Sequence, residues 1–290
     1  MTPISIIIPA YNEVEGISKV IEHVKSFMSL EKIEHEIIVV DDCSTDFTAD
    51  SAKAQGVTVM SHPINRGYGA SLTTGLKKAR YNNILIMDAD ESYPVKDVKK
   101  LLPYVDEYDM VVGARQGKHF HGSLLKRFSR MVFYVLLGYV TGEKIPDANS
   151  GLRIFKKDVV MQFEEDFCSG FSFTTTITII LFSNRYLIKF VPIDYMSRTG
   201  KSKVRHLHDT ARTMQILLHT ITYYNPIKAF LPFSLVSLFI FVISTGFYIF
   251  KIHDIFYGIS AVISLIASML FMAFGMATYA IVKGSRRQIR

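Results

Sequence analysis

Residues 84–90 read ILIMDAD, an apolar run that ends in two aspartates, Asp88 and Asp90. The apolar part predicts a buried strand with two carboxylates at its tip. Hard divalent cations such as Mg²⁺ and Mn²⁺ prefer carboxylate and phosphate oxygens, so Asp88-Ala89-Asp90 indicates a metal and a phosphate-bearing substrate. By itself the tripeptide fits a strand-end cap and a turn towards Pro94 better, and the surrounding motifs decide for the metal.

The same strand belongs to an alternating pattern that runs from residue 4 to residue 204. Strand-like and helix-like segments follow one another, which is typical of an α/β protein with a mostly parallel, Rossmann-like sheet covered by helices on both faces. Helix-like stretches begin near Gly16, Asp46, Gly69 and Lys96. The predicted strands are Ile4 to Pro9, Glu36 to Asp41, Val57 to Ser61, Ile84 to Asp88, Asp109 to Gly113 and Leu187 to Pro192. Ligands of such sheets bind at the carboxyl ends of the strands, where the acidic motifs would meet.

The last quarter of the chain has a different character. Phe230 to Phe250 and Ile255 to Val282 contain no charged residue, and each is long enough to cross a hydrocarbon core of about 30 Å. We expect a transmembrane hairpin, with a buried pair of soluble helices as the alternative. Lysines and arginines flank the two spans, which predicts that both termini and the large soluble part are cytoplasmic. No basic region followed by a cleavage site opens the chain, so no signal peptide is expected.

Composition and charge narrow the choice of partners. The formal net charge is +7, but the basic residues gather beside the apolar spans, which favours an anionic membrane surface over nucleic acid. The two cysteines form no disulfide framework. We expect a catalytic domain over 1–204, an amphipathic juxtamembrane segment over 205–227 and the hairpin with a basic tail over 228–290. The segment 123–140 also reads as an amphipathic helix, either at the membrane surface or packed on the sheet.

Several motifs follow the predicted strand ends. They read P-A-Y-N-E from Pro9, V-D-D-x-S-x-D from Val40, N-x-G-x-G-A from Asn65, D-x-x-S-G-x-R-x-F from Asp147 and R-x-G-x-S-K from Arg198. Together with D-A-D they closely resemble family 2 glycosyltransferases of the GT-A fold, and within them the polyprenyl-phosphate glycosyltransferases such as dolichyl-phosphate mannose synthases. The resemblance covers residues 4 to about 204. It implies an inverting, metal-dependent transfer of one sugar from a UDP- or GDP-sugar to a dolichyl or undecaprenyl phosphate.

The resemblance also implies roles for individual residues. The nucleotide-sugar site would comprise Pro9, Tyr11, Asn12, Glu13, Asp41, Asp42, Asn65, Gly67, Asp88, Ala89, Asp90 and Asp147, the last beside the sugar. Mg²⁺ or Mn²⁺ would bind Asp88 and Asp90. Relatives commonly read D-L-Q and use the glutamine as a further metal contact, whereas this chain has Glu91-Ser92, so Ser92 is the expected third contact with Glu91 or water as alternatives.

The acceptor is expected to require positive charge. A lipid phosphate is already an anion, so arginines can hold it and help neutralise the leaving diphosphate. Arg115, Arg127 and Arg198 match family positions near the acceptor phosphate, and Arg130 and Lys203 are weaker candidates. The expected catalytic residues are Asp90, Arg115 and Arg198. Attraction of Arg198 and Lys203 to anionic lipid is an alternative that is compatible with this role.

Other functions stay open from the sequence. One is transfer to another membrane lipid or glycan acceptor, and another is an inactive nucleotide-sugar-binding scaffold. A processive polysaccharide synthase is disfavoured, because the chain contains no tryptophan and so lacks the Q-x-x-R-W motif of those enzymes. Small surfaces at Gly246, Gly258 and Gly275 leave a homo-oligomer as an alternative to a monomer.

Overall fold

The computed structural model describes residues 2–116, 124–167, 173–196, 215, 218, 221–250 and 254–288. The chain forms two compact units, Met1–Thr213 and Met214–Arg290, which we describe separately. The predicted domain limits at 204 and 227 stay a prediction. Most of the predicted juxtamembrane segment lies outside the described residues.

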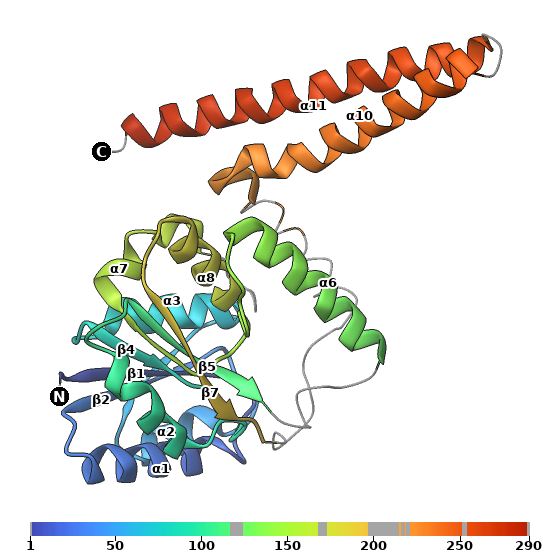
Figure 1. Ribbon diagram of the computed structural model, residues 1–290. Helices are drawn as coiled ribbons and strands as arrows, with labels where there is room; N and C mark the ends of the chain where they lie inside the picture. Colours follow the sequence, from blue (N-terminus) through green and yellow to red (C-terminus); the bar gives the residue numbers. More distant parts are fainter. Residues whose placement is uncertain are drawn as a thin grey trace. The chain divides into compact units, whose positions relative to one another are not determined.

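The first unit is built on one mixed sheet (Figure 1). Within the described residues it has seven strands in the order β3-β2-β1-β4-β6-β5-β7. Their bounds are β1 (Ile4–Ala10), β2 (His35–Asp41), β3 (Thr58–Ser61), β4 (Asn83–Ile86), β5 (Met110–Gln116), β6 (Arg153–Lys156) and β7 (Ile188–Asp194). The mostly parallel sheet predicted from the sequence is confirmed, and the six predicted strands are present with small shifts at their ends.

The short strand β6 was not predicted, and it is the one that runs in the opposite direction. It pairs antiparallel with both β4 and β5, with Arg153 opposite Ile86 on one side and Val112 on the other. Because β6 is reversed, its first residue lies at the edge where β4 and β5 end. The segment that leads into β6 therefore reaches the strand tip that carries Asp88 and Asp90.

Helices cover the two faces of the sheet and bury two apolar cores. One core joins α1 (Ile17–Leu30), α2 (Thr48–Ala54) and the short α4 (Val98–Leu101) to the sheet. The other joins α3 (Tyr68–Lys78), α7 (Lys157–Met161) and α8 (Phe173–Ser183) to the opposite face, as Figure 1 shows. Strands β1 and β2 are buried on both sides, which explains their near-continuous apolar sequences. In the part of the chain that the structure describes, three 3₁₀ turns complete these connections: η1 (Val95–Asp97), η2 (Leu102–Tyr104) and η3 (Glu164–Asp166).

Helix α6 (Leu124–Thr141) has one packed side and one exposed apolar side. Leu137 and Val140 are buried in the first unit, whereas Met131, Val135 and Tyr139 are exposed. The three exposed residues are spaced by four positions and therefore lie on one face of the helix. Both interpretations made from the sequence thus describe part of this helix: it packs on the unit and it also presents an apolar stripe.

The second unit is a helical hairpin of α10 (Pro226–Phe250) and α11 (Ile255–Gln288). Both helices are long and apolar enough to cross a membrane, and only 17% and 22% of their most apolar windows are buried. Hydroxyl groups join the helices: Ser234 Oγ donates to the Ser268 carbonyl at 3.0 Å, and the Ser244 and Ser260 hydroxyls lie 3.0 Å apart.

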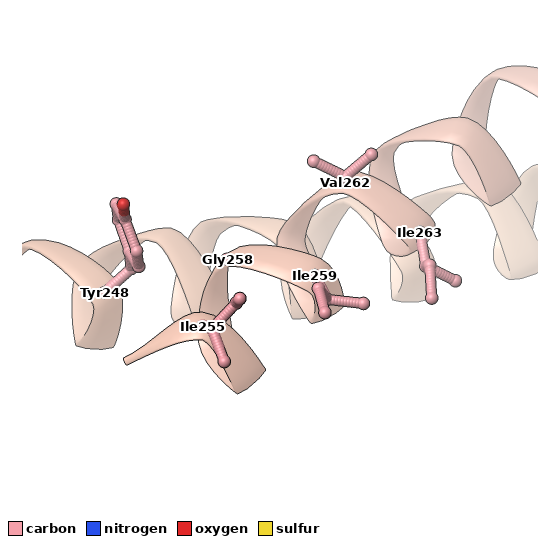
Figure 2. Close-up of a pocket in the computed structure, with 6 residues that line it drawn as sticks. All are labelled: Tyr248, Ile255, Gly258, Ile259, Val262 and Ile263. Atoms are coloured by element: carbon pink, nitrogen blue, oxygen red, sulfur yellow. The ribbon is translucent and has the colours of Figure 1, made fainter. Parts of the chain in front are cut away.

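A hollow of about 450 Å³ lies along this hairpin. Figure 2 shows Tyr248 on α10 facing a row of small and apolar residues on α11. The ring of Tyr248 covers Gly258, where a methyl group would lie 3.3 Å from the ring. Among the described residues that line this hollow, Tyr248 carries a hydroxyl group and the others are aliphatic or glycine, so the lining contains no carboxylate.

Candidate active site

The D-A-D tripeptide follows β4 and is held by hydroxyl groups on both aspartates. Tyr68 Oη donates to Asp88 Oδ1 at 3.1 Å, and the Ser92 hydroxyl donates to Asp90 Oδ1 at 2.5 Å. Burial, assisted by the charge of Asp88, raises the pKa of Tyr68 well above its ordinary value, so this phenol stays protonated and donates. Ser92 is buried and supports Asp90 in this structure, and the direct metal contact expected from the sequence stays a prediction.

Two glycines pack closely against the tripeptide, and sequence analysis did not single them out. At Gly16, just before α1, a Cβ atom would lie 2.6 Å from the carbonyl oxygen of Ala89. At Gly151, just before β6, a Cβ atom would lie 2.6 Å from Asp88 Oδ2. Gly151 belongs to the D-x-x-S-G motif, so its glycine could be noticed in the sequence. Its approach to Asp88 could not be predicted, because it depends on the reversed strand β6.

The predicted nucleotide residues meet at the ends of β1 and β2. The side-chain oxygen of Asn12 accepts a hydrogen bond from the Thr45 backbone amide at 2.7 Å, and the backbone amide of Asn12 donates to the Ser44 hydroxyl at 2.9 Å. Asp41 is buried, and its Oδ1 has no hydrogen-bond partner among the residues that the structure describes. A buried carboxylate oxygen of this kind normally has a donor, so this atom is a candidate contact for a ligand N–H.

Both oxygens of the Asp42 carboxylate have hydrogen-bond partners in residues 62–67, just before α3. Its Oδ1 accepts the Arg66 amide at 2.8 Å and contacts His62 Nδ1 at 2.8 Å, and its Oδ2 accepts the Gly67 amide at 2.7 Å. The Asn65 side chain also donates to the Asp42 carbonyl at 3.3 Å. In this structure Asp42 therefore shapes the loop before α3, and its expected role in nucleotide binding stays a prediction.

Other predicted nucleotide residues lie around this edge. Pro9 is buried within β1 opposite Val40, and Tyr11 and Glu13 follow the strand in partly buried positions. The Glu13 amide donates to the Thr48 hydroxyl at 2.8 Å. Gly67 precedes α3 with a φ of 95°, a conformation that favours glycine. The structure thus gathers the three predicted strand-end motifs, as the parallel sheet requires.

Arg115 and Asp147 form a bidentate ion pair beside this edge of the sheet. Arg115 Nε and Nη2 donate to the two carboxylate oxygens at 2.7 and 2.9 Å, and the Tyr134 hydroxyl of α6 donates to Asp147 Oδ1 at 3.2 Å. Burial alone would raise the pKa of the Asp147 carboxyl, but the hydrogen bonds and charge of Arg115 outweigh it, so this pKa is lowered. The guanidinium carbon of Arg115 lies 5.2 Å from the centre of the Tyr195 ring.

The ion pair bears on the roles predicted for Asp147 at the sugar and for Arg115 at the acceptor phosphate. Asp147 is fully enclosed and already accepts several donors, so in this structure it orients Arg115, and its expected place beside the sugar stays a prediction. Arg115 remains at the edge of the site with its planar group held in one orientation.

A second arginine, Arg153, is completely buried at the start of β6. Its guanidinium donates to the carbonyls of Ser150 at 2.7 Å and Ala148 at 3.1 Å, and to Thr174 in α8 at 3.1 Å. Burial lowers its pKa to about 10, so it stays charged at neutral pH. It therefore ties the segment before β6 to the first turn of α8.

The remaining acceptor candidates cannot be placed. Arg198 and Lys203 lie outside the described residues, and for Arg127 and Arg130 only the helical backbone of α6 is described.

The acidic tip fits a hard divalent cation that a substrate helps to hold. Among the described residues, no group of three or more His, Cys, Asp or Glu side chains could hold a metal ion by itself. Asp88 and Asp90 supply two carboxylates, and Mg²⁺ is commonly bound by one or two carboxylates together with substrate phosphates. The donor set thus suits a metal that binds together with a diphosphate.

Comparisons with known proteins agree with this geometry. The model of the family "Glycosyl transferase family 2" matches residues 5–163. The low-salt glycan biosynthesis hexosyltransferase Agl6 of Haloferax volcanii is 30% identical over 74% of this chain and 53% of its own length. The undecaprenyl-phosphate 4-deoxy-4-formamido-L-arabinose transferase of Yersinia enterocolitica is 30% identical over 54% of this chain and 50% of its own. The chain thus spans about half the length of these two relatives.

A solved structure is similar in fold. Glucosyl-3-phosphoglycerate synthase from Mycobacterium tuberculosis, in complex with Mn²⁺, uridine-diphosphate-glucose and phosphoglyceric acid, superposes with a TM-score of 0.62. The match covers 76% of this chain and 80% of that one at 20% sequence identity. At this level of identity the likeness establishes the GT-A fold of the first unit and no more.

Proposed function

This chain belongs to glycosyl transferase family 2, and we propose that it transfers one sugar from a nucleotide diphosphate to a polyprenyl phosphate at the cytoplasmic face of a membrane. The observation that carries the proposal is the presence in one chain of an acidic strand tip, Asp88 and Asp90, and two helices long enough to cross a membrane. The named acceptor of the Yersinia relative, an undecaprenyl phosphate, supports the same chemistry.

The donor would bind along the carboxyl ends of β1, β2 and β4. The Oδ1 of Asp41, which has no partner among the described residues, would accept an N–H group of the base, which both uracil and guanine possess. The diphosphate would lie at the D-A-D tripeptide, where Asp88 and Asp90 would hold Mg²⁺ or Mn²⁺. When bound, such an ion neutralises charge that develops on the leaving diphosphate.

The acceptor requires orientation more than activation. In an inverting transfer, an acceptor phosphate oxygen forms a bond to the anomeric carbon while the bond from that carbon to the diphosphate breaks. The acceptor phosphate is already an anion, so no general base has to remove a proton. Arg115, with its plane fixed by Asp147, would meet this phosphate together with Arg127, Arg130, Arg198 and Lys203.

The membrane-facing parts would bring the lipid to the site. The hairpin would anchor the chain, and the exposed stripe of Met131, Val135 and Tyr139 on α6 would contact the bilayer surface. Basic residues near both spans favour a cytoplasmic location for the first unit.

A direct assay tests the proposal. Purified protein in lipid nanodiscs is incubated with Mg²⁺ or Mn²⁺, a panel of UDP- and GDP-sugars and a short polyprenyl phosphate, and nucleotide release and glycolipid formation are followed. We expect release that depends on both metal and lipid phosphate and that is lost in Asp90→Asn. Release at the wild-type rate in Asp90→Asn contradicts the metal site, and no release with any donor favours the inactive scaffold.

A further inference from the structure

We propose that Gly151 is a positioning residue for the Asp88 carboxylate, and that the segment 147–151 thereby sets the orientation of the carboxylate that would bind the metal. The inference rests on the proposed function, because Asp88 matters for catalysis only if it holds the metal. It concerns how the site is built rather than which groups touch the substrate.

The Gly151 backbone approaches the Asp88 carboxylate closely. A Cβ atom at Gly151 would lie 2.6 Å from Asp88 Oδ2, 2.7 Å from Oδ1 and 2.8 Å from Cγ. Its three nearest neighbours are therefore the three atoms of one carboxylate group, so an added methyl group would press on that group as a whole. Tyr68 Oη contacts the same carboxylate through Oδ1 at 3.1 Å.

The segment that carries Gly151 is held firmly in place. The Gly151 amide donates to Tyr93 Oη at 2.7 Å, and Tyr93 is itself buried. Arg153 binds the carbonyls of Ala148 and Ser150, and Arg115 holds Asp147 at the other end. Because the backbone is bonded at both ends and at Gly151 itself, an added methyl group would displace the Asp88 carboxylate sooner than the segment.

The expected consequence is a weaker metal site in an otherwise folded protein. Groups that orient a metal ligand without touching the metal typically change metal affinity by about 10- to 100-fold when they are altered. A methyl group at Gly151 moves the ligand itself, so the upper part of this range is expected. The same reasoning explains why a glycine, rather than any small residue, precedes Leu152 and Arg153.

The first experiment measures Mn²⁺ binding to the full chain in detergent by electron paramagnetic resonance, in the presence of UDP or GDP. We expect Gly151→Ala to weaken Mn²⁺ binding at least tenfold. The matched control is Gly75→Ala in α3, where a Cβ atom would lie 2.5 Å from its nearest neighbour, but that neighbour is the apolar Cγ2 of Ile7. The control is expected to unfold at lower temperature and to bind Mn²⁺ as the wild type does. Unchanged binding in Gly151→Ala, or an equal loss in both variants, overturns the proposal.

The second experiment needs no metal, so it separates this inference from the proposed function. Thermal unfolding is followed by circular dichroism for the wild type, Gly151→Ala, Asp88→Ala and the double variant. Asp88→Ala removes all three atoms that the new methyl group would meet, so Gly151→Ala should lower the unfolding temperature in the wild-type background and change it little in the Asp88→Ala background.

Each outcome of the cycle decides the inference. Equal losses in the two backgrounds overturn it, as does a double variant that stays unfolded when Gly151→Ala alone does not fold. If the wild type binds no Mn²⁺ with either nucleotide, the metal in the proposed function is wrong and the positioning of a metal ligand falls with it, whereas the cycle still reports whether Gly151 and Asp88 are in contact.

Discussion

Arg115 donates two hydrogen bonds to the carboxylate of Asp147, and this carboxylate is buried. This pair joins β5 to the segment before β6, and Tyr134 adds α6 to the same contact. A buried ion pair adds little net stability compared with apolar residues, but it leaves an uncompensated charge when one partner is removed. The pair therefore fixes the orientation of the Arg115 guanidinium, and removal of either partner should lower the stability of the folded protein.

Asp147→Asn tests this directly. Removal of the negative charge leaves the largely buried Arg115 without its counter-ion, and breaking such pairs typically costs about 3–5 kcal/mol, with the lower end expected because Arg115 retains some exposure. Thermal unfolding should show this loss. The control is Asp50→Asn at the exposed pair with Lys53, where about 0.5 kcal/mol or less is expected. Equal effects at the two sites would argue against the role given to the pair.

The same aspartate predicts a pH dependence. Its pKa in the folded protein is lower than the ordinary value of about 3.9 for an unfolded chain. Its contribution to stability is therefore fully present above that ordinary value and is lost as the pH falls through the lower, folded-state pKa. Unfolding temperatures measured between pH 6 and pH 3 should fall less steeply at the acid end in Asp147→Asn than in the wild type. Parallel curves would show that other carboxylates dominate acid unfolding.

The alternation of strands and helices was enough to predict the sheet, because β1, β2 and β4 carry long apolar runs with acids at their ends. It was not enough to predict β6. That strand has only four residues, and it begins at Arg153, a charged residue that no period-two pattern would place in a core. Its buried charge is compensated by the carbonyls of Ala148 and Ser150 just before it and of Thr174 in α8, and a single sequence does not reveal this last contact.

Some features of the candidate site could likewise be predicted from the sequence, and others could not. Residues that were assigned from strand ends, such as Asp41 and Asp88, lie where they were expected. The different hydrogen bonding of Asp41 and Asp42 was not predictable, since it depends on which of the two adjacent carboxylates faces the loop before α3. The contact between Gly151 and Asp88 was likewise hidden, because it follows from the reversed direction of β6.

Cys43 provides a prediction about strain. It follows Asp42 with a φ of 63°, a left-handed conformation that favours glycine. Cys43→Gly should therefore raise the free energy of unfolding, by about 0.5–1 kcal/mol after the greater freedom of glycine in the unfolded chain is subtracted. Cys43→Ala keeps the strained conformation and loses only the thiol contact with the Pro63 carbonyl, so no gain is expected there. A gain in both variants would attribute the effect to the thiol.

The apolar stripe on α6 predicts a selective loss of lipid substrate binding. Val135 is two-thirds exposed, and a charge there would prevent it from entering a bilayer surface. Val135→Glu should raise KM for the polyprenyl phosphate in vesicles by about tenfold, equivalent to roughly 1.4 kcal/mol of lost apolar burial. KM for the nucleotide sugar should be unchanged. Leu30→Glu, at an exposed apolar residue at the end of α1, is the control. A rise for both substrates would indicate damage to the fold.

Ser92 distinguishes a supporting group from a metal ligand. In Ser92→Ala the Asp90 carboxylate loses the hydroxyl donor but keeps the Ser92 amide at 3.1 Å, so it should remain close to its present position. One lost hydrogen bond to a charged group corresponds to about 1.5–3 kcal/mol at most, and part of this is recovered by the remaining donor. We therefore expect Mn²⁺ binding to weaken only a few-fold in Ser92→Ala, and to be lost in Asp90→Asn, which removes the charge that attracts the cation. A loss in Ser92→Ala as large as that in Asp90→Asn would make the serine a direct ligand, as the position of glutamine in related sequences suggested.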